Sequence, residues 1–363
     1  MPTHNNDAHK LGEPTLGFVV IGRNEGDRLR RCIDSILEQR QSISPGIEAH
    51  KNDDTLNQDS NLNLPPVVYV DSGSTDGSVE YANSVGSDVI QLDMTTRFTA
   101  ARARNTGLAY LLEKYPNIEY IQFIDGDCAI QPGWLVKAIS FLSVNPHVAI
   151  TCGRRREVYP QRTIYNALCD MEWDTPIGDT KSCGGDFLAR KEAIIAVGGF
   201  NPEMIAGEEP EMCFRLRKKN WKIWRIAEEM TSHDAAMTSF RQFWLRNKRA
   251  GFAYAARSAL HATKQNPYCV REVASICFWA CVFPILIISI YPFSAPIALF
   301  LILAYPAMAF RIFIRKLQRR NSFRRSLVYG VLTQIGKIPQ FFGVTKFAMG
   351  QFSGCKTSII EYK

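Results

Sequence analysis

Two carboxylates one residue apart are the strongest chemical signal in this sequence. Asp125 and Asp127 flank Gly126 directly after residues 120–124, a largely apolar run with the pattern of a buried strand. The glycine lets the backbone turn so that both acids can face one ligand. Carboxylate oxygens are the ligands that Mg²⁺ and Mn²⁺ prefer, so this Asp-x-Asp motif suits a cation that bridges a diphosphate. Taken alone, such a triplet is more often an ordinary turn, so its neighbours must decide.

Polar residues also follow two earlier apolar runs. The first run, residues 16–22, is followed by Asn24 and Glu25, and the second, residues 67–70, is followed by Asp71. Both runs are short and rich in β-branched residues, which is typical of strands buried in a parallel sheet. The carboxyl ends of such strands meet at one edge, where ligands bind. The sequence therefore predicts a single site that gathers these side chains and the acidic pair.

Helical patterns alternate with the apolar runs, as an α/β sheet requires. Residues 27–39 place their apolar side chains on one face, and further helices are predicted over residues 78–85 and 100–114, with a strand over residues 88–92 between them. We therefore predict one α/β domain over residues 15–250, with a Rossmann-like, mostly parallel sheet flanked by helices.

Two segments fall outside this pattern. Residues 1–14 are polar, lack the apolar core of a secretory signal, and are predicted to be a disordered tail. Residues 40–66 are polar and rich in Asn, Asp and Ser, which predicts a surface-loop insertion.

The chain changes character after residue 270. Residues 273–310 carry no charged side chain and are interrupted by a turn-like sequence over residues 291–296, which predicts a hairpin of two transmembrane helices. A buried soluble hairpin is less favoured, because such apolar helices leave no face for water. Residues 251–272 would connect this hairpin to the α/β domain. Residues 311–363 would form a basic juxtamembrane segment, whose stretch 326–350 could lie in the interface or span as a third helix.

The charge and the cysteine content indicate in which compartment the protein works and which partners it binds. The net charge is +8, and much of the basic excess directly follows the apolar stretch, which favours anionic lipid headgroups over nucleic acid. Arg271 precedes the hairpin, so the positive-inside rule predicts that both its ends and the α/β domain lie on the cytoplasmic side of the inner (plasma) membrane. The ten cysteines show no CxxC pair, so we expect reduced thiols.

The order of the motifs resembles that of the family 2 glycosyltransferases, which have the GT-A fold. The segments that carry the resemblance are Gly22-Arg23-Asn24-Glu25, Asp71–Asp76, Ala103–Gly107 and the acidic pair. The resemblance implies a nucleotide diphosphate sugar donor, carrying uridine or guanosine, with Mn²⁺ or Mg²⁺ as cofactor. It implies that Asp71 reads the base, Asp125 approaches the ribose, and Asn24, Glu25 and Arg104 complete the nucleotide site.

The resemblance also assigns the metal and the acceptor side. Asp127 would be the direct metal ligand, and His233 stands where many relatives place a further ligand, although a lone histidine is as often structural. The small-residue segment that lies beside the acceptor in the family corresponds here to Gly184, Gly185 and Asp186.

The general base and a possible diphosphate clamp come from later segments. The family's Glu-Asp motif is matched by Glu208-Glu209, so Glu209 is the expected base and Glu208 the alternative. Here Glu replaces the usual Asp and reaches one methylene farther. Arg246 and Arg249 lie in a basic segment with aromatic residues, which could clamp the diphosphate or lie on the membrane surface.

Together these features predict a membrane-associated inverting glycosyltransferase with a lipid-linked or polysaccharide acceptor, as in exopolysaccharide, capsule or glycolipid assembly. The Gln-x-x-Arg-Trp motif of processive synthases is absent, which favours transfer of single sugars. A dinucleotide oxidoreductase is disfavoured because the first strand is not followed by Gly-x-Gly-x-x-Gly. A sugar nucleotidyltransferase and a non-catalytic membrane scaffold remain as alternatives.

Overall fold

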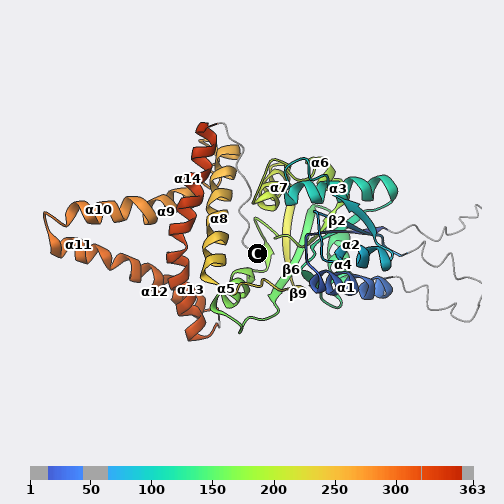
Figure 1. Cartoon of the computed structure of the whole chain (residues 1–363), viewed down its shortest axis with the longest axis horizontal. Helices are drawn as coiled ribbons and strands as arrows, with labels where there is room; N and C mark the ends of the chain where they lie inside the picture. Colours follow the sequence, from blue (N-terminus) through green and yellow to red (C-terminus); the bar gives the residue numbers. More distant parts are fainter. Residues whose placement is uncertain (1–14, 44–63, 320, 354–363) are drawn as a thin grey trace, which may run out of the picture. The chain divides into compact units, whose positions relative to one another are not determined.

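The computed structural model describes residues 15–43, 64–319 and 321–353 (Figure 1). The chain forms two compact units, and each is built from several stretches of sequence. The first unit comprises Met1–Arg155, Pro176–Asn201 and Met212–His233. The second unit comprises Arg156–Thr175, Pro202–Glu211 and Asp234–Lys363. The predicted tail over residues 1–14, and residues 44–63 of the predicted insertion, lie outside the described residues.

The first unit is built around a sheet in the order β3-β2-β1-β4-β8-β6-β9-β5, with β7 paired to β9. The strands are β1 (Leu16–Gly22), β2 (Val67–Asp71), β3 (Asp88–Gln91), β4 (Tyr120–Asp125), β5 (Cys128–Ile130), β6 (Val148–Glu157), β7 (Gly178–Asp179), β8 (Phe187–Arg190) and β9 (Lys222–His233). The pairs β1–β2, β1–β4 and β2–β3 are parallel, as predicted. The pairs β4–β8, β6–β8, β5–β9 and β7–β9 are antiparallel, so the sheet is mixed.

Helices cover the sheet of the first unit, and the bounds of α2 and α3 agree closely with the predicted ones. They are α1 (Asp27–Ile43), α2 (Ser78–Ser84), α3 (Ala100–Lys114), α4 (Trp134–Val144) and α6 (Lys191–Ala196). In Figure 1, α3 and α6 lie on one side of the strands and α1 and α4 on the other. Helix α1 continues to Ile43, four residues beyond the predicted end and into the predicted insertion.

A glycine allows α3 to pack tightly on the strands that carry the site. A Cβ atom at Gly107 would lie 2.6 Å from Val19 Cγ1 and 2.9 Å from Val70 Cγ2, closer than side chains tolerate. The helix begins at Thr99, whose side chain accepts a hydrogen bond from the backbone N–H of Arg102. The glycine of the Ala-Arg-Asn-x-Gly motif therefore has a packing role, and it holds the helix that carries Arg104 against β1 and β2.

The second unit is helical. It contains α5 (Ile164–Trp173), α8 (Phe240–His261), α9 (Val270–Cys277), the π-helix η2 (Phe278–Val282), α10 (Phe283–Ile290), α11 (Ala295–Ile302), α12 (Ala304–Leu317), α13 (Phe323–Ile335) and α14 (Lys337–Ser353). Helix α7 (Glu208–Lys218) begins in this unit and continues in the first. Helices α8 and α14 approach closely, because a Cβ atom at Gly251 would overlap the carbonyl oxygen of Gln340 and one at Gly343 would overlap that of Lys248.

Two continuous helices match the predicted hairpin and extend beyond it. Val270–Ile290 and Ala295–Leu317 are 21 and 23 residues long, and within the described residues these are the helices long and apolar enough to cross a membrane. Only 17% and 11% of their apolar windows are buried within the protein. The turn between them falls where the sequence predicted it, and much of their apolar surface is exposed.

Residues 326–350 do not form one long helix, as a third membrane span would require. It forms α13 and α14, of 13 and 17 residues, with Gly336 between them. Each is shorter than the roughly 20 residues that a span needs. Pro339 lies in the first turn of α14, where proline removes no helical hydrogen bond.

Candidate active site

The carboxyl ends of β1, β2 and β4 meet, as the sequence predicted. After β1, the backbone N–H of Asn24 donates to Ser74 Oγ at 2.9 Å, and Asn24 Oδ1 accepts from the backbone N–H of Thr75 at 2.8 Å. Asn24 holds a left-handed φ of 53°, which asparagine tolerates better than most residues. After β4, the backbone N–H of Gly126 donates to the carbonyl of Ile21 at 2.8 Å. The three loops therefore form one connected edge.

Asp71 organises the loop after β2. Its carboxylate is buried, and Oδ1 accepts from the Tyr69 hydroxyl at 2.9 Å. Oδ2 accepts from the backbone N–H groups of Gly73 and Ser74, both at 2.9 Å. Burial, and then the Asp71 carboxylate, raises the pKa of Tyr69 well above its ordinary value, so this phenol remains a donor. Contact between Asp71 and a nucleotide base stays a prediction.

The Asp125 carboxylate is held by a group of charged residues that we name the arginine–aspartate cluster: Arg104, Asp125, Arg155 and Asp186. Arg104 on α3 pairs with Asp125 Oδ1 at 2.6 Å, and Arg155 on β6 lies 3.8 Å from Asp125 Oδ2. The side chain of Asp125 is 28% exposed, whereas that of Arg104 is 4% exposed. The cluster therefore presents one carboxylate at the surface of the strand edge and buries the cation that orients it.

Asp186 is the fully buried member of the cluster. Its Oδ1 accepts from the backbone N–H of Asp125 at 3.0 Å, and its Oδ2 accepts from Thr231 Oγ1 at 2.8 Å and pairs with Arg155 at 2.7 Å. Burial alone would lower the pKa of the Arg155 guanidinium, but the Asp186 carboxylate raises it. These contacts give Asp186 a role in positioning Asp125. The resemblance implied that this segment lies beside the acceptor, and a direct contact of the Asp186 carboxylate with an acceptor would require it to leave these partners.

The predicted acceptor-side glycines lie against the same cluster. A Cβ atom at Gly185 would overlap Asp125 Oδ2 and lie 3.0 Å from Arg104 Nη2. Gly184 has a φ of 89°, in the left-handed region that favours glycine. The small residues of this segment are therefore required by the close approach of its backbone to Asp125.

Asp127 and His233 form the part of the site that suits a cation. Strand β5 pairs with β9 so that Cys128 faces His233, and His233 Nε2 lies 3.0 Å from Asp127 Oδ2. Both side chains are buried, and Asp127, Cys128 and His233 each offer one possible ligand atom within 4.8 Å of the others. Two ligands at right angles around a cation at about 2.1 Å lie roughly 3.0 Å apart. A carboxylate and an imidazole at this separation fit Mn²⁺ or Mg²⁺.

The candidate bases lie in the first turn of α7. Glu209 is 5% exposed and Glu208 is half-buried, after Gly207 with a φ of 77°. Both belong to the second unit, whereas Asp127 belongs to the first. Glu211, two residues further along α7, is buried and pairs with His261 Nε2 on α8 at 2.8 Å.

The predicted diphosphate clamp also belongs to the second unit. Arg246 on α8 pairs with Glu172 on α5 at 2.6 Å, and Arg249 is half-buried one turn further along α8. A clamp formed by these arginines stays a prediction.

The main residue that sequence reasoning missed is Arg155. Its signal was the run of arginines at residues 154–156, which directly follows the apolar start of β6. Charged side chains are rarely buried unless paired, so an arginine run that continues a buried strand indicates inward-facing partners.

Known proteins share parts of this sequence. Residues 18–182 match the family model for glycosyl transferase family 2. The pre-mycofactocin glycosyltransferase of Mycobacterium tuberculosis is 26% identical over 214 residues, which are 55% of this chain and 44% of that protein. Glycosyltransferase AglE of Haloferax volcanii is 20% identical over 230 residues, which are 61% of this chain and 67% of that protein. The chain therefore spans less than half the length of the mycobacterial relative.

A solved structure shares the fold over most of the chain. A mannosyltransferase from Pyrobaculum calidifontis, in complex with GDP-Man and Mn²⁺, aligns over 89% of this chain and 88% of its own. The TM-score is 0.56 and the identity is 17%. At this identity the likeness concerns the fold, and it confirms the GT-A architecture that the motifs implied.

Proposed function

Because residues 18–182 match glycosyl transferase family 2 and the fold is GT-A, we propose that the chain is a family 2 glycosyltransferase. It would be a cation-dependent, membrane-associated enzyme that transfers a sugar from a nucleotide diphosphate sugar to an acceptor hydroxyl with inversion. The observation that carries the proposal is the pairing of Asp127 with His233 at 3.0 Å, two residues beyond Asp125, the carboxylate that Arg104 orients. A donor site needs both a cation ligand and a nucleotide-binding acid at one strand edge.

The donor nucleotide binds along the ends of β1, β2 and β4. Asn24 and Glu25 line the first loop, Asp71 holds the second in shape and accepts from the base, and Asp125 accepts from the ribose hydroxyls. The hydrogen bond from Asn24 to the neighbouring loop supports this arrangement, because it joins two of these segments. The GDP-Man carried by the Pyrobaculum mannosyltransferase supports a nucleotide-sugar donor, with GDP- and UDP-sugars as the candidates.

Asp127 and His233 would hold Mn²⁺ or Mg²⁺. When bound, the cation offsets the negative charge that develops on the leaving diphosphate. The Mn²⁺ of the Pyrobaculum enzyme and the donor set described above both support this assignment. The protein's own contribution is to keep the buried Asp127 carboxylate and His233 imidazole together, where their hydrogen bond orients both side chains.

Glu209 acts as the general base of a single displacement. It takes the proton of the acceptor hydroxyl as the acceptor oxygen attacks the anomeric carbon, and the diphosphate leaves from the opposite face. Its place in the first turn of α7, in the segment that matches the family's Glu-Asp motif, supports this role. Glu208, beside it in the first turn of α7, is the alternative.

The apolar hairpin inserts into the membrane, and the catalytic unit lies on the cytoplasmic side. The acceptor is lipid-linked or a polysaccharide. Phe293 at the turn is 91% exposed, so the described part of the chain leaves the tip of the hairpin largely uncovered. An epitope tag inserted at residue 293 tests this topology in bacterial spheroplasts. We expect antibody to reach this tag from outside, while an N-terminal tag stays inaccessible until the cells are lysed. The reverse pattern would contradict the orientation.

The donor proposal is tested by thermal stabilisation of the purified full chain. A nucleotide sugar at about 100 times its Kd should stabilise the fold by roughly 2.7 kcal/mol, and only with Mn²⁺ present. Asp127→Ala should abolish the cation-dependent part. Asp179→Ala is the matched control, because Asp179 is an exposed acid that pairs with Arg217. Equal stabilisation of wild type and Asp127→Ala, with and without Mn²⁺, would show that the metal assignment is wrong.

A further inference from the structure

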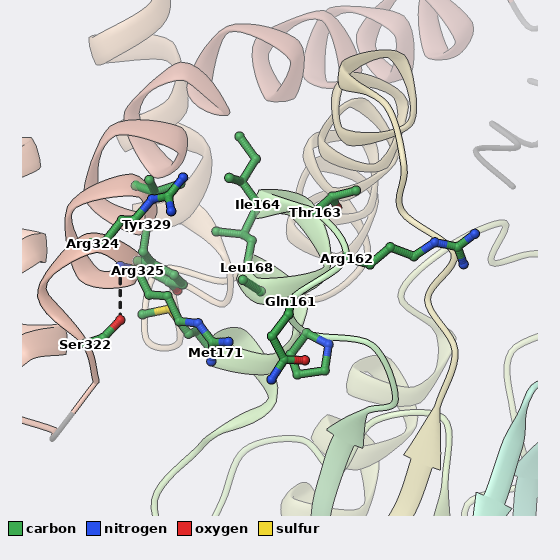
Figure 2. Close-up of a pocket in the computed structure, with 13 residues that line it drawn as sticks. Gln161, Arg162, Thr163, Ile164, Leu168, Met171, Ser322, Arg324, Arg325 and Tyr329 are labelled. Atoms are coloured by element: carbon green, nitrogen blue, oxygen red, sulfur yellow. Dashed lines mark hydrogen bonds between the residues drawn. The ribbon is translucent and has the colours of Figure 1, made fainter.

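A basic pocket of about 380 Å³ lies in the second unit between α5 and α13 (Figure 2). Arg324 and Arg325 enter it from the first turn of α13, after the N-cap residue Ser322. Leu168 and Val328 contribute apolar surface. Arg162 also lines this pocket, although its guanidinium extends away from the other two arginines in Figure 2. Among the described residues that line the basic pocket, none is acidic.

The charges around the basic pocket are suited to an anion. Within the described part of the chain, neither Arg324 nor Arg325 forms an ion pair. Lys316 adds a third cation beside the lining, because its Nζ lies 4.2 Å from the centroid of the Tyr329 ring and donates to the carbonyl of Met171 at 2.6 Å. The N-terminus of α13 contributes its partial positive charge at the same place. A phosphate group offers the charge and the acceptor oxygens that two guanidinium groups bind best.

A second pocket, which we name the apolar pocket, has a volume of about 430 Å³. It lies between the two apolar helices and the C-terminal half of α13, and its walls include Trp279, Tyr305, Val331 and Ile335. Gln334 is the exception among lining residues that otherwise have apolar or aromatic surfaces. Such a cavity suits a hydrocarbon chain.

Helix α13 connects the two pockets along one face. Arg324, Val328, Val331 and Ile335 are spaced by four, three and four residues, so they lie on one stripe of the helix. The first two line the basic pocket and the last two line the apolar pocket. From Arg324 to Ile335 the helix rises by roughly 16 Å, which an extended lipid chain spans easily.

We propose that the basic and apolar pockets together bind one single-chain lipid phosphate, with the phosphate monoester between Arg324 and Arg325 and the chain in the apolar pocket. One cation-lined pocket and one apolar cavity on the same stripe of α13 match one headgroup and one chain. This site lies wholly within the second unit and is separate from the donor site, so the inference does not depend on the proposed transfer reaction.

The test uses native mass spectrometry of the purified full chain in a nonionic detergent, with farnesyl phosphate as the probe. We expect one molecule to bind per chain, at least about ten-fold more tightly than farnesol, because charge-assisted bonds to phosphate are lost in the alcohol. Inorganic phosphate at an excess on the order of 100-fold should not compete, because it lacks the hydrocarbon chain and the affinity that the chain contributes. Equal binding of farnesol would overturn the basic half of the proposal, and competition by inorganic phosphate would overturn the apolar half.

Variants of the basic pocket distinguish specific binding at this site from general electrostatic attraction of the protein to anionic lipid. Arg324→Gln with Arg325→Gln should weaken farnesyl phosphate binding about ten-fold or more. Arg315→Gln is the matched control, because Arg315 is an exposed member of the same basic segment and does not line the basic pocket. Equal loss in the control would show that binding is nonspecific.

The apolar pocket is tested by filling it. Ile335→Trp should block the chain and abolish binding while the melting temperature stays within a few degrees of wild type, and Val331→Trp serves if the first variant does not fold. Displacement of farnesyl phosphate by an equal concentration of dioleoyl phosphatidic acid would overturn the single-chain assignment and identify bilayer phospholipid as the occupant. Unchanged binding in both tryptophan variants would overturn the chain site.

Discussion

Replacing Asp186 by asparagine removes a buried charge with almost no change of shape. The asparagine oxygen can still accept from the backbone N–H of Asp125, as Asp186 Oδ1 does at 3.0 Å. Its amide group would face Thr231 Oγ1 and the Arg155 guanidinium, which the carboxylate contacts at 2.8 and 2.7 Å. The Arg155 cation then loses its principal partner while it remains largely buried.

The cost follows from burial. Breaking a buried ion pair by removing one partner destabilises a protein by about 3–5 kcal/mol. Asp186 is fully buried, so solvent does not screen the pair, but Asp125 Oδ2 lies 3.8 Å from Arg155 and offsets part of the loss. We therefore expect about 3 kcal/mol for Asp186→Asn. For a unit of 150–250 residues this corresponds to a decrease of roughly 6–12 °C in the melting temperature.

The assay is thermal unfolding of the full chain in detergent, monitored by a probe of the first unit. Asp179→Asn is a matched control, because Asp179 pairs with Arg217 at a similar distance, 2.9 Å, on exposed side chains. Exposed pairs contribute about 0–1 kcal/mol, so the control should shift the melting temperature by roughly 2 °C or less. Donor KM should rise in Asp186→Asn and stay unchanged in the control, because Asp125 loses its orientation.

Two results would refute this reasoning. Equal, small shifts for Asp186→Asn and Asp179→Asn would mean that burial does not strengthen the pair in this protein. A large decrease in melting temperature with an unchanged donor KM would mean that Asp186 stabilises the fold without positioning Asp125.

Three further predictions concern other residues of the first unit and α7. Gly185→Ala should weaken donor binding about ten-fold or more in titration calorimetry, because the new Cβ would overlap Asp125 Oδ2; unchanged affinity would contradict this. Glu209→Gln should lower turnover by roughly 10²-fold with little change in donor affinity, whereas collapse only in Glu208→Gln would transfer the role. Burial, and then nearby carboxylates, raises the pKa of Cys32 well above its ordinary value, so iodoacetamide at pH 8 should spare it in the folded protein; rapid alkylation there, measured by mass spectrometry, would show otherwise.

The local pattern of residues was enough to predict the first half of the sheet. The strand Leu16–Gly22 and the helix Ala100–Lys114 have the predicted bounds, because alternating buried runs and amphipathic stretches encode parallel strands and crossover helices. In such sheets the carboxyl ends of neighbouring strands lie at one edge, so the meeting of Asn24, Asp71 and Asp125 followed from their positions alone.

The composition of the C-terminal stretch was also sufficient to predict two long apolar helices with a turn between them. It did not predict that α14 packs against α8, where Gly251 lies close to Gln340 and Gly343 close to Lys248. That packing joins segments far apart in the sequence.

Only the tertiary structure decided which charges meet inside the first unit. Asp186 contacts Asp125 and Arg155 because β8 lies between β4 and β6, and this order belongs to the antiparallel half of the sheet, where neighbours in space are far apart in sequence. The 3.0 Å contact between Asp127 and His233 likewise depends on the register of β5 with β9. A register shift of one residue would turn His233 to the other face of the sheet, and residue types alone do not set that register.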